Sequence, residues 1–206
     1  LALDEIGVYL KERESSDAEQ DTALLYALLN STVEQAPAGS GGVIFTPWLH
    51  GNRAPAQDPY ARAMFFNVGL NTGKRMLVRA VLEGVAFHKR WILEFMEKRV
   101  PRQQKLRFAG GGAKSDAWCR IMADVTGRTI EAVENPQDAG AMGAALISAT
   151  GLGLISNIEH AGALIPVHKT YGPDPSHREI YDKQYAVFKN LYGANKKFFR
   201  ALNAEH

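Results

Sequence analysis

The sequence has little of several features that would place it in a specialised class. It holds one cysteine, Cys119, among 206 residues, so no disulfide can form within the chain. No apolar run is long enough to cross a bilayer, and the chain does not open with a secretory signal pattern. We therefore expect a protein of the reducing cytoplasm. The formal net charge of +2 is small and its charges are dispersed, which favours neither a nucleic-acid nor a membrane partner.

Motifs of metal binding and of nucleophilic catalysis are also missing. The six histidines lie far apart, and none has a Cys or Glu at metal-ligand spacing, so we expect no metal site within the chain. The nucleophile elbow G-x-S-x-G is not present. Cys119 falls within a helical pattern, where it is expected to be a small buried hydrophobic residue rather than a nucleophile.

What the chain does have is enough apolar sequence for a sizeable core. Hydrophobic residues make up 46% of it, an ordinary share for a globular protein. Because no Gly- or Ser-rich linker divides residues 1–206, we expect one domain. The chain begins with Leu1 and runs directly into an apolar-periodic stretch, which is typical of a piece of a larger protein.

Periodicity predicts the main elements. Helices are expected at residues 1–13, 22–33, 74–99, 116–126 and 139–150, and in a last segment that begins at Asp174-Pro175; strands are expected at residues 43–46, around Leu106 and Phe108, and at residues 129–133. Residues 154–173 are predicted to be a loop with short elements. Strands that alternate with helices between residues 105 and 150 predict an α/β domain whose sheet is covered by helices.

Small residues within these helices predict close packing. Gly84 lies in the middle of a strong helical pattern, where glycine costs about 1 kcal/mol against alanine, so a neighbouring element is expected to approach it closely. The helix at residues 139–150 contains Gly140 and Gly143, and its small side chains are expected to let it press against a sheet or another helix. An aromatic stripe along the last helix, from Tyr181 to Tyr192, is interpreted as core packing.

The most informative stretch is the glycine run Gly110-Gly111-Gly112, which lies between a strand pattern and a helix pattern. Glycines permit a tight turn and let a ligand approach the backbone. Ser115 or Asp116 would cap the following helix. A strand, a bare turn and a helix N-terminus together suit a nucleotide. The run matches neither G-x-x-x-x-G-K-[ST] nor G-x-G-x-x-G, and a glycine turn used only for strand–helix packing remains an equal alternative.

Four segments in register carry a family resemblance. Residues 45–62 resemble a proline-flanked G-E-R-x-P loop followed by D-P-x-x-R-G, and residues 79–87 an R-A-x-x-E-G-x-A-F helix. Residues 110–125 resemble G-G-G-x-x-S/N-x-x-W-x-Q-x-x-A-D, and residues 140–145 resemble G-A-x-G-A-A. These are motifs of the C-terminal domain of the FGGY carbohydrate kinases, in the actin-like ATPase superfamily. Residues 45–48 and Trp118-Cys119 look most like xylulokinase-type members.

This resemblance implies a fold and a ligand. The fold would be an actin-like ATPase (ribonuclease H-like) α/β domain, a mixed sheet flanked by helices, incomplete at its N-terminal side. Gly110, Gly111 and Gly112 would border the adenosine of ATP, with the backbone of Gly111 against the nucleoside. Ser115 stands where relatives offer a side chain to the adenine, and the helix at residues 139–150 would pack behind this site. Arg53 is expected to pair with a carboxylate such as Asp58, with a direct substrate role as the lesser alternative.

The resemblance also implies what the chain lacks. In FGGY kinases an N-terminal domain brings the D-x-G-[TS] phosphate turn, the sugar pocket and the catalytic base, and no such turn occurs in residues 1–206. ATP would be the cofactor, with Mg²⁺ held mainly by ATP and by the absent domain. We therefore expect no catalytic residue and no kinase activity in the isolated chain. Its partners would be that N-terminal domain and a sugar at the interdomain cleft, and a homodimer is left open.

Departures from the family pattern leave alternatives open. Asn52 replaces the usual Glu, Ala63 replaces the Gly after Arg62, and Arg120 stands where Gln is common. The leading hypothesis is the ATP side of a kinase that acts on a pentulose or related polyol. The alternative is a non-catalytic actin-like module that binds nucleotide as a switch or scaffold. A dinucleotide oxidoreductase would need a glycine fingerprint that the sequence does not contain.

Overall fold

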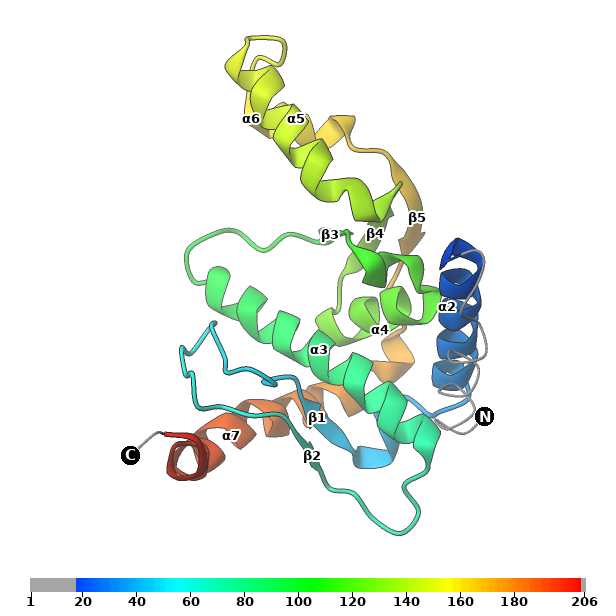
Figure 1. The fold of residues 1–206 in the computed structure, drawn as a ribbon, viewed down its shortest axis with the longest axis vertical. Helices are drawn as coiled ribbons and strands as arrows, with labels where there is room; N and C mark the ends of the chain where they lie inside the picture. The colour runs from blue at the N-terminus through cyan, green and yellow to red at the C-terminus, as the bar shows by residue number, and fades with distance from the viewer. Residues whose placement is uncertain (1–17, 205–206) are drawn as a thin grey trace.

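The computed structural model describes residues 18–204, and the predicted helix at residues 1–13 lies outside them. The fold is α/β, as expected, with its helices gathered around two small sheets (Figure 1). Its main helices are α2 (Ala18–Glu34), α3 (Lys74–Met96), α4 (Asp116–Thr126), α5 (Ala139–Gly151), α6 (Ile158–Ala161) and α7 (Arg178–Asn203). None of the helices in this part of the chain is both long and apolar enough to span a membrane.

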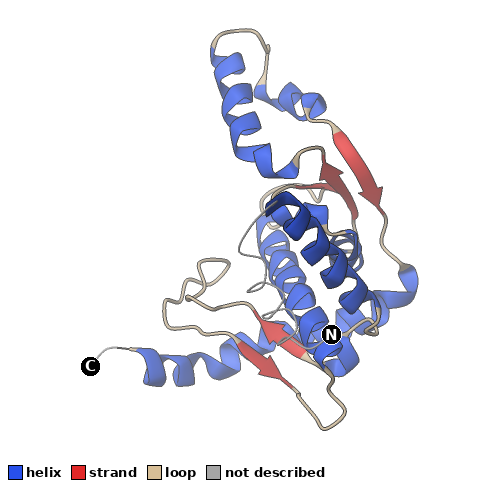
Figure 2. Ribbon diagram, turned by 45° about the vertical axis from the view of Figure 1, so that its right-hand side comes forward, coloured by secondary structure: helices blue, strands red, loops and turns tan. Residues whose placement is uncertain are grey.

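A mixed three-stranded sheet carries the glycine run. Its order is β3 (Lys105–Phe108), β4 (Thr129–Val133) and β5 (Val167–Tyr171), with β3 and β4 parallel and β5 antiparallel to β4 (Figure 2). In the β3–β4 register, Leu106 pairs with Ile130 and Arg107 with Glu131. Because side chains alternate between the faces of a sheet, one face is apolar and the other carries the Arg107–Glu131 ion pair. The expected strands at Leu106–Phe108 and residues 129–133 are confirmed, and β5 was expected only as an irregular segment.

The second sheet lies against the middle of α3. It pairs β1 (Ile44–Thr46) with β2 (Met64–Phe66) in antiparallel register. An ideal Cβ built on Gly84 of α3 would lie 2.1 Å from the backbone oxygen of Phe45. Only a residue without a side chain permits this approach. The close contact predicted at Gly84 is therefore confirmed.

The core is aromatic where α7 crosses α3 and the segment after β1. Trp48 and Phe188 are fully buried, with ring centroids 5.6 Å apart, and Phe87 lies 5.7 Å from Phe188. Tyr181 and Tyr185 stand on the same face of α7 and are also buried. The aromatic stripe is therefore core, as predicted. Asp174 accepts a hydrogen bond from the backbone N–H of Ser176 and so caps the start of this last helical segment.

A buried polar network joins three segments of the core. Glu83 on α3 pairs with Arg79 at 2.7 Å and accepts a 2.8 Å hydrogen bond from the hydroxyl of Tyr181 on α7. It also accepts hydrogen bonds from the hydroxyl of Ser40 and the backbone N–H of Gly39, at 2.6 and 2.9 Å. Burial, reinforced by the charge of Glu83, holds the pKa of Tyr181 well above its ordinary value, so this phenol stays protonated as a donor. The Arg and Glu of the R-A-x-x-E-G segment are therefore structural.

The loop after β1 differs from expectation at Arg53. Asn52 and Asp58 exchange backbone hydrogen bonds, and the carboxylate of Asp58 accepts from the hydroxyl of Tyr192 and the backbone N–H of Tyr60. Arg53 is exposed and forms none of the ion pairs among residues 18–204. The expected Arg53–Asp58 pair is wrong, because a tyrosine from α7 reaches the buried carboxylate instead.

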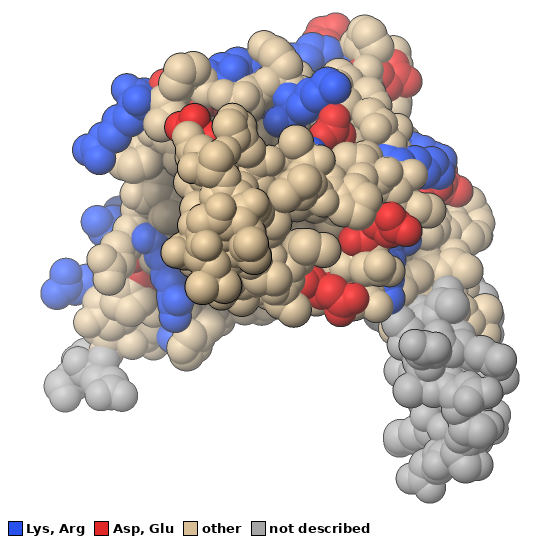
Figure 3. Space-filling model, turned by 90° about the horizontal axis from the view of Figure 1, so that it is seen from above, with Lys and Arg blue, Asp and Glu red and all other residues tan. Residues whose placement is uncertain are grey.

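Helices α5 and α6 project away from the rest of the fold (Figure 1). No residue of α5 is buried, and a Cβ on Gly140 or Gly143 would meet no heavy atom within 4 Å. Seen from above, this projecting arm presents a surface almost free of charged side chains (Figure 3). The expected close packing of α5 behind the glycine run is therefore wrong for the described residues. Gly140 and Gly143 instead have open space beside them.

Candidate functional site

The glycine run forms an exposed turn at the C-terminal end of β3. Gly110 has φ +84° and ψ 179°, a backbone conformation that glycine adopts and other residues avoid. Its N–H donates a 2.6 Å hydrogen bond to the carbonyl of Pro136, which opens the short helix η3 (Pro136–Asp138). A Cβ on Gly110 would meet nothing within 4 Å, so open space lies beside the turn. Gly111 then begins the short helix η2 (Gly111–Lys114) and is exposed.

The three glycines serve different purposes. Gly112 is required by packing, because a Cβ there would lie 2.7 Å from the ring of Trp118. That ring packs edge-on against Phe108, with centroids 6.1 Å apart. At Gly111 the nearest atom to an ideal Cβ is the hydroxyl oxygen of Tyr26, at 2.9 Å. Gly110 therefore supplies the conformation and Gly112 the strand–helix packing, whereas Gly111 is exposed and its missing Cβ leaves room for the hydroxyl of Tyr26.

Ser115 caps α4 and is enclosed. Its hydroxyl oxygen accepts a 3.1 Å hydrogen bond from the backbone N–H of Trp118 and donates at 2.5 Å to the side-chain oxygen of Asn30 on α2. The predicted cap is confirmed. The residue is 0% exposed, so the side-chain contact with adenine that the resemblance implies is not available in this structure. Ser115 holds the turn and does not reach beyond it.

Charged side chains surround the N-terminus of α4. Hydrogen bonds from Lys169 and Tyr171 on β5 hold the pKa of the Asp116 carboxyl below its usual value. A carboxylate at this end of a helix is favoured by the helix dipole. Arg120 points outward, half exposed, and pairs with Glu34 on α2 at 2.6 Å. The departure at Arg120 therefore creates a surface ion pair beside the turn.

Cys119 does not contribute chemistry to this site. It is fully buried, and burial raises the pKa of its thiol to about 11. A thiol in this environment stays protonated near neutral pH and is a poor nucleophile. The interpretation of Cys119 as a small buried hydrophobic residue is confirmed.

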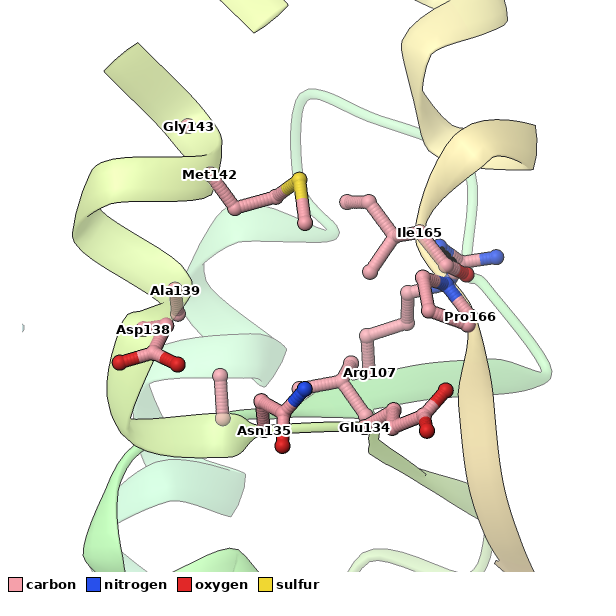
Figure 4. A pocket seen from close by; sticks show the side chains of 11 residues that line it. Arg107, Glu134, Asn135, Asp138, Ala139, Met142, Gly143, Ile165 and Pro166 are labelled. Atoms are coloured by element: carbon pink, nitrogen blue, oxygen red, sulfur yellow. Dashed lines mark hydrogen bonds between the residues drawn. The ribbon is translucent and has the colours of Figure 1, made fainter. Parts of the chain in front are cut away.

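A cavity of about 200 Å³ lies beside the turn, between α5 and the sheet. Met142 on α5 and Ile165 face each other across it, and Arg107 on β3 lies along its floor (Figure 4). The guanidinium of Arg107 is held by the carbonyl of Ile165 at 3.0 Å. Gly110, Gly111 and Gly112 do not line this cavity. It separates α5 from the sheet and reaches Ala109, the residue directly before Gly110.

Two residues of the site lie on α2, which the sequence predicted as a helix without a role in the site. Tyr26 and Asn30 on α2 contact the glycine turn and its cap, respectively. Their spacing of four residues, continued by Glu34, is the only sequence signal for them, since it places all three on one helix face. In the described part of the chain, no three His, Cys, Asp or Glu side chains gather in a way that could hold a metal ion.

Comparisons with known proteins bear on this geometry. Residues 3–152 match the model of the FGGY family of carbohydrate kinases, C-terminal domain. The xylulose kinase of Staphylococcus epidermidis is 30% identical over 160 residues, which are 77% of this chain and 32% of that protein. Among solved structures, xylulose kinase from Rhodospirillum rubrum gives a TM-score of 0.73 at 31% identity, covering 85% of this chain and 35% of that one.

A second solved structure is similar to this chain over nearly its whole length. Ligand-bound xylulose kinase from Lactobacillus acidophilus gives a TM-score of 0.76 at 26% identity, covering 95% of this chain and 39% of that chain. The chain thus spans about a third of the length of the relatives it matches. The residues matched by the family model include the glycine run.

Proposed function

The chain belongs to the FGGY family of carbohydrate kinases, and from this premise we propose that it is the ATP-binding part of a sugar kinase. The reaction would transfer the γ-phosphate of ATP to a hydroxyl of a pentulose or a related sugar or polyol. The family and the actin-like ATPase fold, with its mixed sheet and flanking helices, agree with the sequence-based expectation. Xylulose kinases among the similar proteins support the choice of a pentulose.

The observation that carries the proposal is the exposed glycine turn. Gly110, Gly111 and Gly112 would hold the adenosine of ATP, with the exposed backbone of Gly111 against the nucleoside. The space beside Gly110, which no side chain fills, suits such a ligand. Ser115 would act indirectly, because its buried hydroxyl fixes the start of α4 and hence the shape of the turn.

Chemistry at the phosphates would need more than this chain. Phosphoryl transfer depends on positioning, on charge stabilisation and on a base at the acceptor hydroxyl. We propose that Mg²⁺ comes with the phosphates of ATP and is held mainly by an N-terminal domain of the same kinase. That domain would also supply the base and the sugar pocket. The isolated chain would then bind nucleotide without phosphorylating a sugar.

The open face of α5 supports a partner domain. Ile147 and Leu152 are largely exposed, and no charged residue interrupts α5. Contiguous exposed apolar surface commonly marks a contact with another protein segment. The strand β3 also lies at the edge of the sheet formed by the described residues. We propose that the rest of the same kinase covers α5 and pairs with this edge.

Valine at Gly111 tests the nucleotide site. In a calorimetric titration, the 206-residue chain should bind ATP and ADP, and Gly111→Val should weaken binding more than tenfold, that is by more than about 1.4 kcal/mol. The branched side chain would occupy the space where the nucleoside meets the backbone, and it would collide with the hydroxyl of Tyr26. Titration with ketoses should give no heat of binding.

A matched glycine supplies the control. Gly193 on α7 is exposed and has no neighbour within 4 Å of an ideal Cβ, so Gly193→Val should leave nucleotide affinity unchanged. If the Gly111→Val variant binds nucleotide as tightly as the wild-type chain, the glycine turn is not the nucleotide site. Tight ketose binding by this chain would contradict the division of labour between two domains.

A further inference from the structure

The helix α2 lies beside α4 (Figure 1), and its side chains reach the cap of α4 and the glycine turn. Tyr26, Asn30 and Glu34 recur every four residues and form what we call the polar stripe. Glu34 pairs with Arg120 at 2.6 Å. The side-chain oxygen of Asn30 accepts from the hydroxyl of Ser115 and, at 3.4 Å, from the backbone N–H of Ala117. Two of the three members of the stripe thus anchor α2 to α4.

The third member points at the exposed part of the turn. The hydroxyl oxygen of Tyr26 lies 2.9 Å from where a Cβ on Gly111 would stand. The side chain of Tyr26 is half-buried. Among residues 24–204, this hydroxyl has no hydrogen-bond partner, whereas the hydroxyls of Tyr181 and Tyr192 donate to Glu83 and Asp58. A donor is therefore held at the rim of the turn.

We propose that Tyr26 is a nucleoside-binding residue whose hydroxyl forms a hydrogen bond with the ribose or purine of a nucleotide lying on Gly111. This inference rests on the proposed function and adds a residue from a separate helix to the site. The ligand group is the nucleoside rather than a phosphate, because a neutral phenol offers one directional donor and no positive charge. The anchoring of α2 through Asn30 and Glu34 fixes the distance between the phenol and the turn.

Phenylalanine at Tyr26 removes the hydroxyl and leaves the ring. In calorimetric titrations of the 206-residue chain, Tyr26→Phe should weaken binding of ATP and of adenosine by roughly three- to tenfold, the effect of one lost neutral hydrogen bond. Binding of inorganic tripolyphosphate should be the same in both proteins. Tyr60→Phe is the control, because the ring of Tyr60 lies beside Arg200, away from the turn. Thermal unfolding of each variant checks that the fold is intact.

The outcomes separate this inference from the proposed function. If the wild-type chain binds ATP and Tyr26→Phe binds it equally well, the role of Tyr26 is wrong and the proposed function stands. A loss that is equal for ATP and tripolyphosphate would also overturn it, because the effect would then not concern the nucleoside. If the wild-type chain binds neither ATP nor adenosine, the proposed function itself fails.

Discussion

Replacement of Glu83 by alanine is expected to lower the free energy of unfolding by about 3–5 kcal/mol. Glu83 is 1% exposed and accepts hydrogen bonds from α3, from α7 and from the segment before β1. Alanine would leave the guanidinium of Arg79 buried without its counter-charge, and it would strip the hydroxyl of Ser40 of its acceptor. A buried ion left unpaired is more costly than a lost contact, because its desolvation is no longer offset.

The measurement is urea unfolding followed by circular dichroism, with a surface ion pair as control. Glu34→Ala removes the partner of Arg120, but both side chains of that pair are half exposed, so the loss should be below about 1 kcal/mol. Should Glu83→Ala fail to fold, Glu83→Gln keeps the shape of the side chain and should show a smaller loss in the same direction. If Glu83→Ala lowers the free energy of unfolding no more than Glu34→Ala does, the buried network around Glu83 does not stabilise the fold as described.

Alanine at Gly84 should destabilise the chain by about 3 kcal/mol, although alanine is the better helix former by about 1 kcal/mol. The new Cβ would lie 2.1 Å from the backbone oxygen of Phe45 and 2.9 Å from its carbonyl carbon. Both are backbone atoms of β1 and cannot rotate away as the end of a side chain could. The strand β1 must therefore move away from α3, and the packing of both elements suffers.

Gly193→Ala is the matched control for Gly84→Ala. Gly193 also lies inside a helix, α7, but an ideal Cβ there meets no heavy atom within 4 Å. In Gly193→Ala only helix propensity and the entropy of the unfolded chain change, so the free energy of unfolding should rise by up to about 1 kcal/mol. Equal stability changes in the two variants would show that β1 does not need its close approach to α3.

Local signals in the sequence predicted the elements that fix the turn. The bounds of α4 and β4 agree with the expected residues 116–126 and 129–133, because Ser115 and Gly127 mark the ends of α4 and because polar and apolar residues alternate from Thr129 to Ala132 in β4. The strand β5 was missed because four of its five residues are exposed, so no alternation of apolar and polar residues marks it. The short strand β2 was not predicted either, and it is largely exposed.

The site was only partly predictable, because its contacts are long-range. Gly110, Gly111 and Gly112 are recognisable from their position between a strand and a capped helix. The burial of Ser115 depends on Asn30, which is 85 positions away in sequence. In the same way, Asp58 meets Tyr192 on α7 rather than the nearby Arg53. Chain order does not predict which distant side chain reaches a buried polar group, and so these partners required the fold.

The most direct test of the nucleotide site is an ADP titration followed by the amide resonances of glycines labelled with nitrogen-15. We predict that Gly110, Gly111 and Gly112 shift progressively and saturably, whereas Gly193 on α7 and Gly69, in the connection between β2 and α3, stay unchanged. Saturable shifts confined to glycines outside the turn, with no change at these three, would contradict the assignment of the turn as the nucleotide site.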